Sequence, residues 1–309
     1  MDQIEKNKVD IINGTSANGQ SGKGKRLDVM KTYKLYIDGK FPRTESGRYY
    51  ILKDSKGEQL ANICQGSRKD FREAVVAARK AQPGWASKSA YNKGQILYRI
   101  AEMLEGRKSQ FIEELMLQGS SQAKAEKEVE LSIDRLVYYA GWSDKYQQVF
   151  SAVNPVDSSH FNFSMAEPMG IVSALSSENY GLIGLVSLIA PAIVGGNTVI
   201  ILASSEKPLC AVTFGEVINS SDVPGGVVNI LTGYRSELLT HFANHMDVNA
   251  IMYSGNSQEE ISKIKELASL NVKRALIYSN IVDMNESTHN GYRIMDVQET
   301  KTTWHPIGQ

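Results

Sequence analysis

The sequence predicts an α/β fold with an open parallel sheet flanked by helices, and three observations lead to this prediction. Between residues 170 and 277, short apolar segments alternate with segments of helical periodicity, which is the pattern of βαβ units. The segment 182–194 is apolar nearly all round, so we expect a buried helix there. The chain has 309 residues, 42% of them hydrophobic, which is enough for a substantial core.

Composition excludes several classes of protein. Lys and Arg number 34 and Asp and Glu number 34, so a broad attraction to nucleic acid or to anionic membranes is not expected. The two cysteines, Cys64 and Cys210, exclude a disulfide scaffold and a cysteine-rich metal site. No apolar run reaches the roughly 18 residues that a membrane span needs, and the N-terminus carries no apolar signal core. We therefore expect a soluble, cytoplasmic protein.

The N-terminal part is predicted to begin with a tail and a hairpin. Residues 1–30 are rich in Asn, Gly, Ser and Lys, and we expect a disordered tail there because 13–25 contain almost nothing that could be buried. Order should begin near Tyr33, where apolar and polar residues alternate on both sides of Asp38-Gly39, a dipeptide typical of hairpin turns. A disordered tail, an α/β domain over 31–279 and a terminal segment 280–309 are the expected divisions.

Three helices are expected before the sheet. Ser67 is placed to cap a helix that runs to about Ala81, and Pro83-Gly84 is expected to end it. Apolar residues at helical spacing predict further helices over 90–117 and 122–149.

The remaining elements follow from periodicity. Residues 160–168 alternate like a strand with one polar face, and a last alternating stretch, 297–304, predicts another strand. The expected strands of the sheet are 170–175, 198–202, 226–231, 249–253 and 272–277. The expected helices between them are 182–194, 209–219, 235–245 and 257–269.

Four sequence blocks are typical of one enzyme family. They are AEPMGIV at 166–172, GGNTVIILASSEKPL at 195–209, DVPGGVVNILTG at 222–233 and YSGNS at 253–257. In this order and spacing, over about residues 31–278, the chain resembles the aldehyde dehydrogenase superfamily. VYYAGWSDKY at 137–146 and HMDVNAI at 245–251 give a closer resemblance to the degenerate second module of tandem two-module aldehyde dehydrogenases.

The resemblance implies that residues 31–279 form a Rossmann-like NAD-binding domain and that residues 280–309 form a short linker and a C-terminal oligomerisation strand. It also implies a catalytic cysteine on a separate inserted domain. Neither cysteine fits that place. Cys64 lies in a predicted strand near the N-terminus, and Cys210 opens a helix whose dipole could lower its pKa. We interpret both as buried structural residues, with the short polar segment 280–293 standing where the catalytic domain would be inserted.

Two further catalytic positions can be compared with the family pattern. Tyr278 stands at the place of the general-base Glu, and a phenol is a poor base at neutral pH. Asn179 keeps the place of the oxyanion-hole Asn, while Glu178 replaces the Trp that precedes it. Without a nucleophile, we interpret Asn179 as a turn residue between strand and helix.

The cofactor positions are partly retained. Compared with the family pattern, Ala203 replaces the Lys that binds the adenine ribose, whereas Glu206 keeps the place of the ribose-binding Glu. The last glycine of the phosphate loop is Glu260, and Ser257 with Glu260 predicts a capping box that would satisfy the helix N-terminus internally. We therefore expect either no cofactor or weakly bound NAD(P). The candidate cofactor-binding residues are Ser205, Glu206, Gly226, Gly255 and Ser257.

The histidines do not indicate a metal site. His241 and His245 are four residues apart, but neither an HExxH motif nor a third ligand accompanies them. His245 is better explained as a structural residue before a strand.

These observations favour a catalytically inactive aldehyde dehydrogenase homologue that acts as a structural or regulatory subunit. In the family, a strand like 160–168 pairs with a terminal strand like 299–304 (ETKTTW) in an oligomerisation sheet. We therefore expect a homo-oligomer, or assembly with a full-length aldehyde dehydrogenase. The alternatives are an NAD(P)-dependent oxidoreductase that acts on aldehydes through Tyr278 or a residue of 280–293, and a dinucleotide sensor that uses Glu206.

Overall fold

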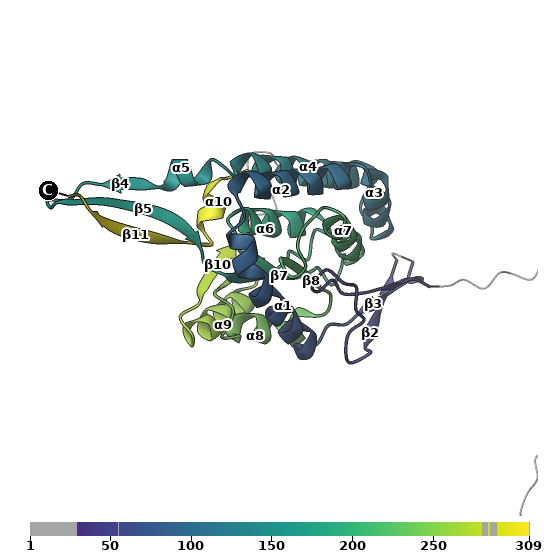
Figure 1. The fold of residues 1–309 in the computed structure, drawn as a ribbon. Helices are drawn as coiled ribbons and strands as arrows, with labels where there is room; N and C mark the ends of the chain where they lie inside the picture. The colour runs from purple at the N-terminus through teal and green to yellow at the C-terminus, as the bar shows by residue number, and fades with distance from the viewer. Residues whose placement is uncertain (1–29, 55, 280–283, 285–288, 309) are drawn as a thin grey trace, which may run out of the picture.

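The computed structural model describes residues 30–54, 56–279, 284 and 289–308. A body of helices around a sheet carries an arm of long strands that projects to one side (Figure 1). The predicted disordered tail, 1–30, lies outside the described residues except for Met30, and so does most of 280–288.

The body is built on a five-stranded parallel sheet, as predicted. The strand order is β10-β9-β6-β7-β8. The strands are β6 (Ile171–Leu175), β7 (Thr198–Leu202), β8 (Val228–Leu231), β9 (Ala250–Ser254) and β10 (Arg274–Tyr278). All residues of β6, β7, β8 and β9 are buried, which explains why they are read as continuous apolar runs.

Helices cover both faces of the sheet. On one face α6 (Ile183–Val194) and α7 (Leu209–Asn219) form a core with the helices behind them. On the other face α1 (Arg68–Ala86), α8 (Arg235–Asn244) and α9 (Gln258–Ser269) form a second core (Figure 1). The predicted burial of 182–194 is confirmed, since every residue of α6 is buried.

Helix α1 passes through the predicted stop at Pro83-Gly84. Ser67 caps it as expected, in a capping box with Asp70. The helix nevertheless continues to Ala86, because Trp85 is buried and its Nε1 donates to the carbonyl of Ile193 at 2.8 Å. Tertiary packing of one aromatic residue thus outweighs the cost of a proline inside the helix.

The two long helices predicted over 90–117 and 122–149 are each broken. The structure has α2 (Ala90–Glu105), α3 (Lys108–Leu117), α4 (Gln122–Trp142) and α5 (Tyr146–Phe150). Gly106 ends α2, and Arg107 turns toward α7, where its Nη2 lies 2.5 Å from Glu216 Oε2. A pairing partner this distant in the chain leaves no mark on local periodicity.

The N-terminal sheet contains β1 (Thr32–Tyr33), β2 (Tyr49–Lys53) and β3 (Gln59–Cys64) in the order β1-β3-β2. The predicted turn at Asp38-Gly39 is confirmed, with φ of 54° and 71°. The residues on either side of this turn form single β-bridges rather than full strands: Ile37 pairs with Lys40, and Tyr36 pairs with Ile230 in β8.

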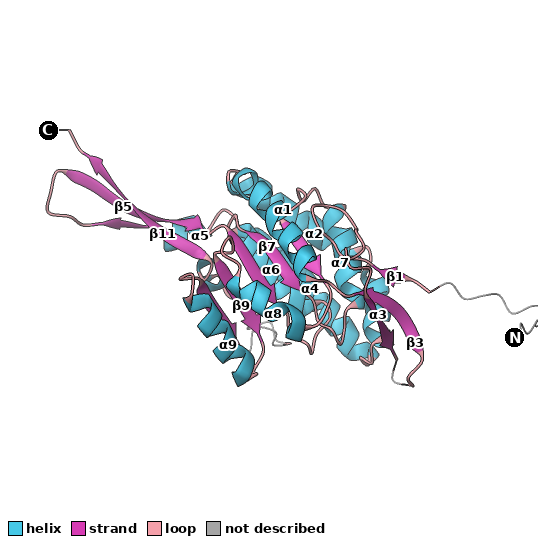
Figure 2. Cartoon of the chain, turned by 90° about the horizontal axis from the view of Figure 1, so that it is seen from below, coloured by secondary structure: helices cyan, strands magenta, loops and turns pink. Residues whose placement is uncertain are grey.

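The arm is a three-stranded antiparallel sheet in the order β11-β5-β4 (Figure 2). It contains β4 (Ala152–Asn154), β5 (His160–Pro168) and β11 (Gln298–Pro306), and a short helix, α10 (Tyr292–Met295), precedes β11. The two strands predicted from alternation are therefore confirmed, and they pair with each other along their whole length. At the root, Asn197 Nδ2 donates to the carbonyl of Val297 at 3.0 Å.

No helix in the described part of the chain is both long and apolar enough to cross a membrane.

Candidate functional site

A cavity of about 690 Å³ lies at the carboxyl ends of β6, β9 and β10. Open parallel sheets bind ligands at this edge, in the crevice outside the ends of the strands. Its lining is polar and comes from four connections between strands and helices. The lining residues are Ser177, Glu178, Asn179, Tyr180, Arg235, Tyr253, Ser254, Gly255, Asn256, Ser257, Glu260 and Ser279.

The Glu178 carboxylate accepts hydrogen bonds from the N–H and hydroxyl groups that follow β7. Its Oε2 accepts from the backbone N–H of Ser205 at 2.7 Å and from the Ser204 hydroxyl at 3.0 Å. The Ser205 hydroxyl and the N–H of Glu206 lie 3.2 and 3.4 Å from the same oxygen. One carboxylate oxygen therefore engages the turn between β7 and α7, as a bound anion would.

Arg235 connects two carboxylates across the cavity. Its Nε lies 3.0 Å from Glu178 Oε1, and its Nη1 lies 3.1 Å from Glu260 Oε2. Its Nη2 donates to the carbonyls of Ser254, at 3.2 Å, and Ser176. Because the Arg235 side chain is only 12% exposed, these pairs are screened less than surface ion pairs.

Tyr253 completes this network, and its hydroxyl explains why residue 255 is a glycine. The Tyr253 hydroxyl donates to Glu260 Oε2 at 2.6 Å, and the Arg235 guanidinium lies 5.2 Å from the Tyr253 ring centroid. A Cβ on Gly255 would meet the Tyr253 hydroxyl at 2.6 Å. In this structure Gly255 thus makes room for an internal hydrogen bond.

The structure brings some of the predicted cofactor residues together and not others. Asn179, Gly255 and Ser257 line the cavity, and Ser205 lies beside it through its contact with Glu178. Glu206 is exposed and is not among the lining residues.

Gly226 lies away from this cavity, in the turn before β8 at the amino edge of the sheet. It has φ of 85°, and a Cβ there would lie 2.5 Å from the carbonyl oxygen of Ala77. Its place in the fold is therefore explained by close packing against α1 rather than by a ligand.

The predicted capping box is only half formed. The Ser257 hydroxyl accepts from the N–H of Glu260 at 3.3 Å, as expected. The expected return bond from Glu260 to Ser257 is wrong, since the Glu260 carboxylate turns to Arg235 and Tyr253. A partly buried ion pair outweighs the local cap.

Tyr278 does not face the cavity. Its hydroxyl donates to Asp296 Oδ2 at 2.7 Å, and the Arg293 guanidinium lies 4.1 Å from its ring centroid. Burial, and then the charge of Asp296, raises the pKa of the phenol far above its ordinary value. These contacts hold Tyr278 against the segment that leads into β11.

Both cysteines are free and buried, as interpreted from the sequence. The expected lowering of the Cys210 pKa is wrong. Burial raises the pKa of this thiol, and the neighbouring Glu114 adds to the effect, so the helix dipole does not prevail.

His245 lies in a structural position, as interpreted from the sequence. His245 follows α8, where its Nδ1 accepts from the N–H of Asp247 at 3.3 Å and its ring packs edge-on against Phe71. Among the residues that the structure describes, no group of three or more His, Cys, Asp or Glu side chains is placed to hold a metal ion.

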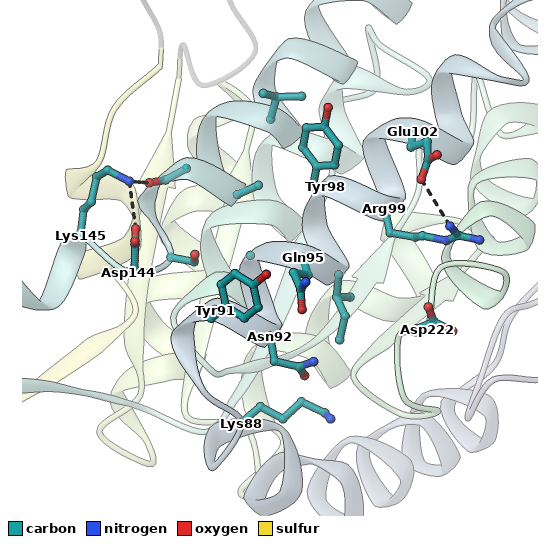
Figure 3. A pocket seen from close by; sticks show the side chains of 16 residues that line it. Lys88, Tyr91, Asn92, Gln95, Tyr98, Arg99, Glu102, Asp144, Lys145 and Asp222 are labelled. Atoms are coloured by element: carbon teal, nitrogen blue, oxygen red, sulfur yellow. Dashed lines mark hydrogen bonds and ion pairs between the residues drawn. The ribbon is translucent and has the colours of Figure 1, made fainter.

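A second hollow, of about 900 Å³, lies between α2 and α4 and is open to solvent (Figure 3). Its charged side chains pair locally, Lys145 with Asp144 at 2.9 Å and Arg99 with Glu102 at 3.4 Å. Such exposed pairs are ordinary surface features, and no reactive group converges there among the described lining residues.

Sequence reasoning missed the roles of Arg235 and Tyr253. One signal for Arg235 was available. It is the first residue of α8, where a cation opposes the helix dipole, so an engagement with carboxylates elsewhere could have been inferred. Tyr253 gave no comparable signal, because its partner is set by the turn after β9.

The five-stranded parallel sheet and the polar crevice at its carboxyl edge define an α/β protein of the dinucleotide-binding type. The chain belongs to the aldehyde dehydrogenase family, whose sequence profile matches residues 41–278.

The relatives are about twice as long as the matched region. Retinal dehydrogenase 2 of Gallus gallus is 31% identical over 259 residues, which cover 81% of this chain and 49% of the relative. The same protein of Homo sapiens is 30% identical over 80% of this chain and 48% of its own length. This chain thus spans about half the length of the curated relatives it matches.

Solved structures match the same region. PnpE from Pseudomonas sp. WBC-3 is 27% identical, with a TM-score of 0.76 over 80% of this chain and 50% of its own. A second PnpE structure, with a TM-score of 0.75, is described as a complex with nicotinamide adenine dinucleotide.

The cavity residues of this chain do not fit a pyrophosphate as they are arranged. The donors after β7 are engaged by Glu178, and the N–H of Glu260 at the start of α9 is engaged by Ser257. The guanidinium of Arg235 already pairs with two carboxylates. A dinucleotide would therefore have to displace internal partners.

Proposed function

We propose that this chain is a catalytically inactive member of the aldehyde dehydrogenase family that acts in the cytoplasm as a structural or regulatory subunit. In this proposal it assembles with itself or with a full-length aldehyde dehydrogenase, as the degenerate second module of a tandem protein accompanies the first.

One observation carries the proposal of inactivity. The family profile ends at residue 278, the last residue of β10, and β11 already begins at Gln298. The family resemblance places the nucleophile on a domain inserted between these strands. Here the connection contains only α10 among its described residues, and both cysteines of the chain lie elsewhere and are buried. The buried, hydrogen-bonded Tyr278 supports the same reading.

The arm supports the proposal of assembly. β11 lies at the edge of its sheet, paired with β5 on one side only, and its side chains are mostly exposed. Large apolar side chains are exposed on the same arm, with Val153 at 66%, Phe161 at 43% and Trp304 at 57%. Long exposed strand edges with apolar neighbours favour pairing with another chain.

Sedimentation velocity tests this assembly. We expect the intact protein to sediment as a homo-oligomer or to co-sediment with a full-length aldehyde dehydrogenase. A variant without residues 299–309 keeps the anchoring contacts of Val297 and Gln298 and should sediment as a monomer. The proposal fails if the intact protein is a monomer that captures no full-length homologue, or if the deletion leaves the oligomer unchanged.

A second candidate function is dinucleotide sensing with weak NAD(P) binding. The crevice at the carboxyl edge of the sheet favours it, since this is where the fold binds nucleotides. Calorimetric titration with NAD and NADP tests it, and the absence of heat at millimolar dinucleotide would reject it. Aldehyde-dependent absorbance at 340 nm tests the oxidoreductase alternative. Turnover that Tyr278→Phe abolishes would overturn the proposal of inactivity.

A further inference from the structure

The crevice at the carboxyl edge of the sheet contains an anion of its own. Glu178 Oε2 accepts from the N–H groups of Ser205 and Glu206, at 2.7 and 3.4 Å, and from neighbouring hydroxyls. Successive backbone N–H groups after a strand are typical binding sites for phosphate oxygens. The side chain of Glu178 thus uses the donors that a bound oxyanion would use.

This contact continues as a bridge that joins the carboxyl ends of four neighbouring strands. Arg235 holds Glu178 Oε1 at 3.0 Å and Glu260 Oε2 at 3.1 Å. In the sheet order, Glu260 belongs to the helix after β9, Glu178 follows β6, and its donors follow β7. Arg235 begins the helix after β8, the next strand along. Because Arg235 also donates to the last carbonyl of β9, the bridge is tied to the sheet itself.

The charges of the bridge oppose a second anion. Two carboxylates share one guanidinium, so the bridge keeps an excess negative charge. Glu259 adds another exposed carboxylate in the first turn of α9. A pyrophosphate would have to displace Glu178 from its donors and then lie beside Glu260, with no free cation on the bridge to compensate.

We propose that Glu178 is an intramolecular occupant of an oxyanion site, and that the Glu178–Arg235–Glu260 bridge makes the crevice reject ligands that carry phosphate groups. Glu178 is then a specificity-determining residue, since its removal opens the donors after β7 to a dinucleotide. This inference goes beyond the proposed role as an assembling subunit, which concerns the arm, and it opposes the second candidate, dinucleotide sensing.

Calorimetric titration of NAD and of inorganic pyrophosphate into four proteins tests the proposal: wild type, Glu178→Ala, Glu178→Gln and Glu259→Gln. Loss of a charge-assisted competitor should let Glu178→Ala bind NAD at least about tenfold more tightly than wild type. Glu178→Gln should gain less, about threefold, because its amide oxygen can still accept from Ser205. Pyrophosphate should follow the same order.

Glu259→Gln is the matched control. It removes one negative charge close to the crevice without touching the bridge, so its NAD affinity should stay within about twofold of wild type. An equal gain in Glu259→Gln and Glu178→Ala would overturn the proposal in favour of net charge. Unchanged or weaker binding in the Glu178 variants, or no binding in any variant at millimolar NAD, would also overturn it.

Two further measurements distinguish a change in ligand affinity from unfolding and from a change in assembly. The thermal midpoint of each variant reports folding, and if Glu178→Ala unfolds, the near-isosteric Glu178→Gln decides alone. Sedimentation of the same variants should be unchanged, because the arm lies at the opposite edge of the sheet. A monomeric protein whose Glu178 variants gain NAD affinity would refute the proposed assembly and leave this inference standing.

Discussion

The parallel sheet of the body and the antiparallel arm are both made of strands, but different forces hold them. Every residue of β6 and β7 is buried between helices, whereas β11 is exposed along most of its length. Burial of apolar side chains stabilises the first. Backbone pairing and surface contacts such as Lys301 with Glu167, at 2.9 Å, hold the second. The comparison indicates that apolar burial stabilises the body, whereas the exposure of the arm is the observation on which the proposed assembly rests.

Core truncation should give the largest effect and the sharpest contrast. Ile201 in β7 is fully buried, so Ile201→Ala should lower the free energy of unfolding by about 2–5 kcal/mol. Thr300 in β11 is exposed, and Thr300→Ala should change it by less than about 0.5 kcal/mol. Urea unfolding of both variants measures the difference, and equal losses would contradict the comparison.

Two glycines with nearly equal backbone angles test close packing in the body. Gly226 has φ of 85° and Gly57 has φ of 84°. A Cβ on Gly226 would lie 2.5 Å from the carbonyl oxygen of Ala77, while nothing lies within 4 Å of one on Gly57. Both substitutions meet the same backbone strain, so Gly57→Ala should cost about 1 kcal/mol of unfolding free energy. Gly226→Ala should cost about 2–4 kcal/mol, because the clash with Ala77 is added to that strain. Thermal unfolding of both variants measures the two costs. Similar losses of stability would mean that backbone strain alone, and not the clash with Ala77, sets the cost.

The stability of the body should also depend on pH. Burial raises the pKa of Glu114, a residue of α3 that accepts from Thr213 of α7, to about 7. The folded state therefore binds more protons than the unfolded state between about pH 4.5 and 7, and stability from this group falls as the pH rises through that window.

The size of this effect is at most about 1.4 kcal/mol per pH unit for one proton. Glu114→Gln should flatten the dependence in urea unfolding at several pH values. Glu113→Gln, which changes an exposed neighbour on the same helix, should keep it. A slope that persists in Glu114→Gln would assign the dependence to other groups.

The smallest effect concerns the arm itself. The pair between Lys301 and Glu167 is largely exposed, with side chains 58% and 45% accessible. A double-mutant cycle with Lys301→Ala and Glu167→Ala should give a coupling of about 0.5 kcal/mol or less. A coupling above about 1 kcal/mol would show that this pair stabilises the arm more than exposed pairs usually do.

Local patterns predicted the strands and helices of the sheet and both long strands of the arm. They failed where distant partners decide. Trp85 carries α1 past Pro83 because of a contact with α6, and Arg107 breaks a helix by pairing with Glu216 in α7. Neither partner is visible within a window of local sequence.

The candidate site was predicted in part for the same reason. The turns after strands indicated Asn179, Gly255 and Ser257, which do line the cavity. The ion bridge could not be derived from these turns, because it joins the ends of strands that are far apart in the chain. Gly226 was selected by its motif, although its glycine is required by packing against α1.

Strand β6 separates the arm from the crevice. It starts three residues after β5 ends and finishes three residues before Glu178, so its five residues hold the two regions roughly 17 Å apart. If the arm assembles the protein as proposed, damage to each region has a different genetic consequence. A chain with a damaged crevice but an intact arm would still enter assemblies and would act as a dominant mutant. A chain with a damaged arm would stay outside them and would be recessive.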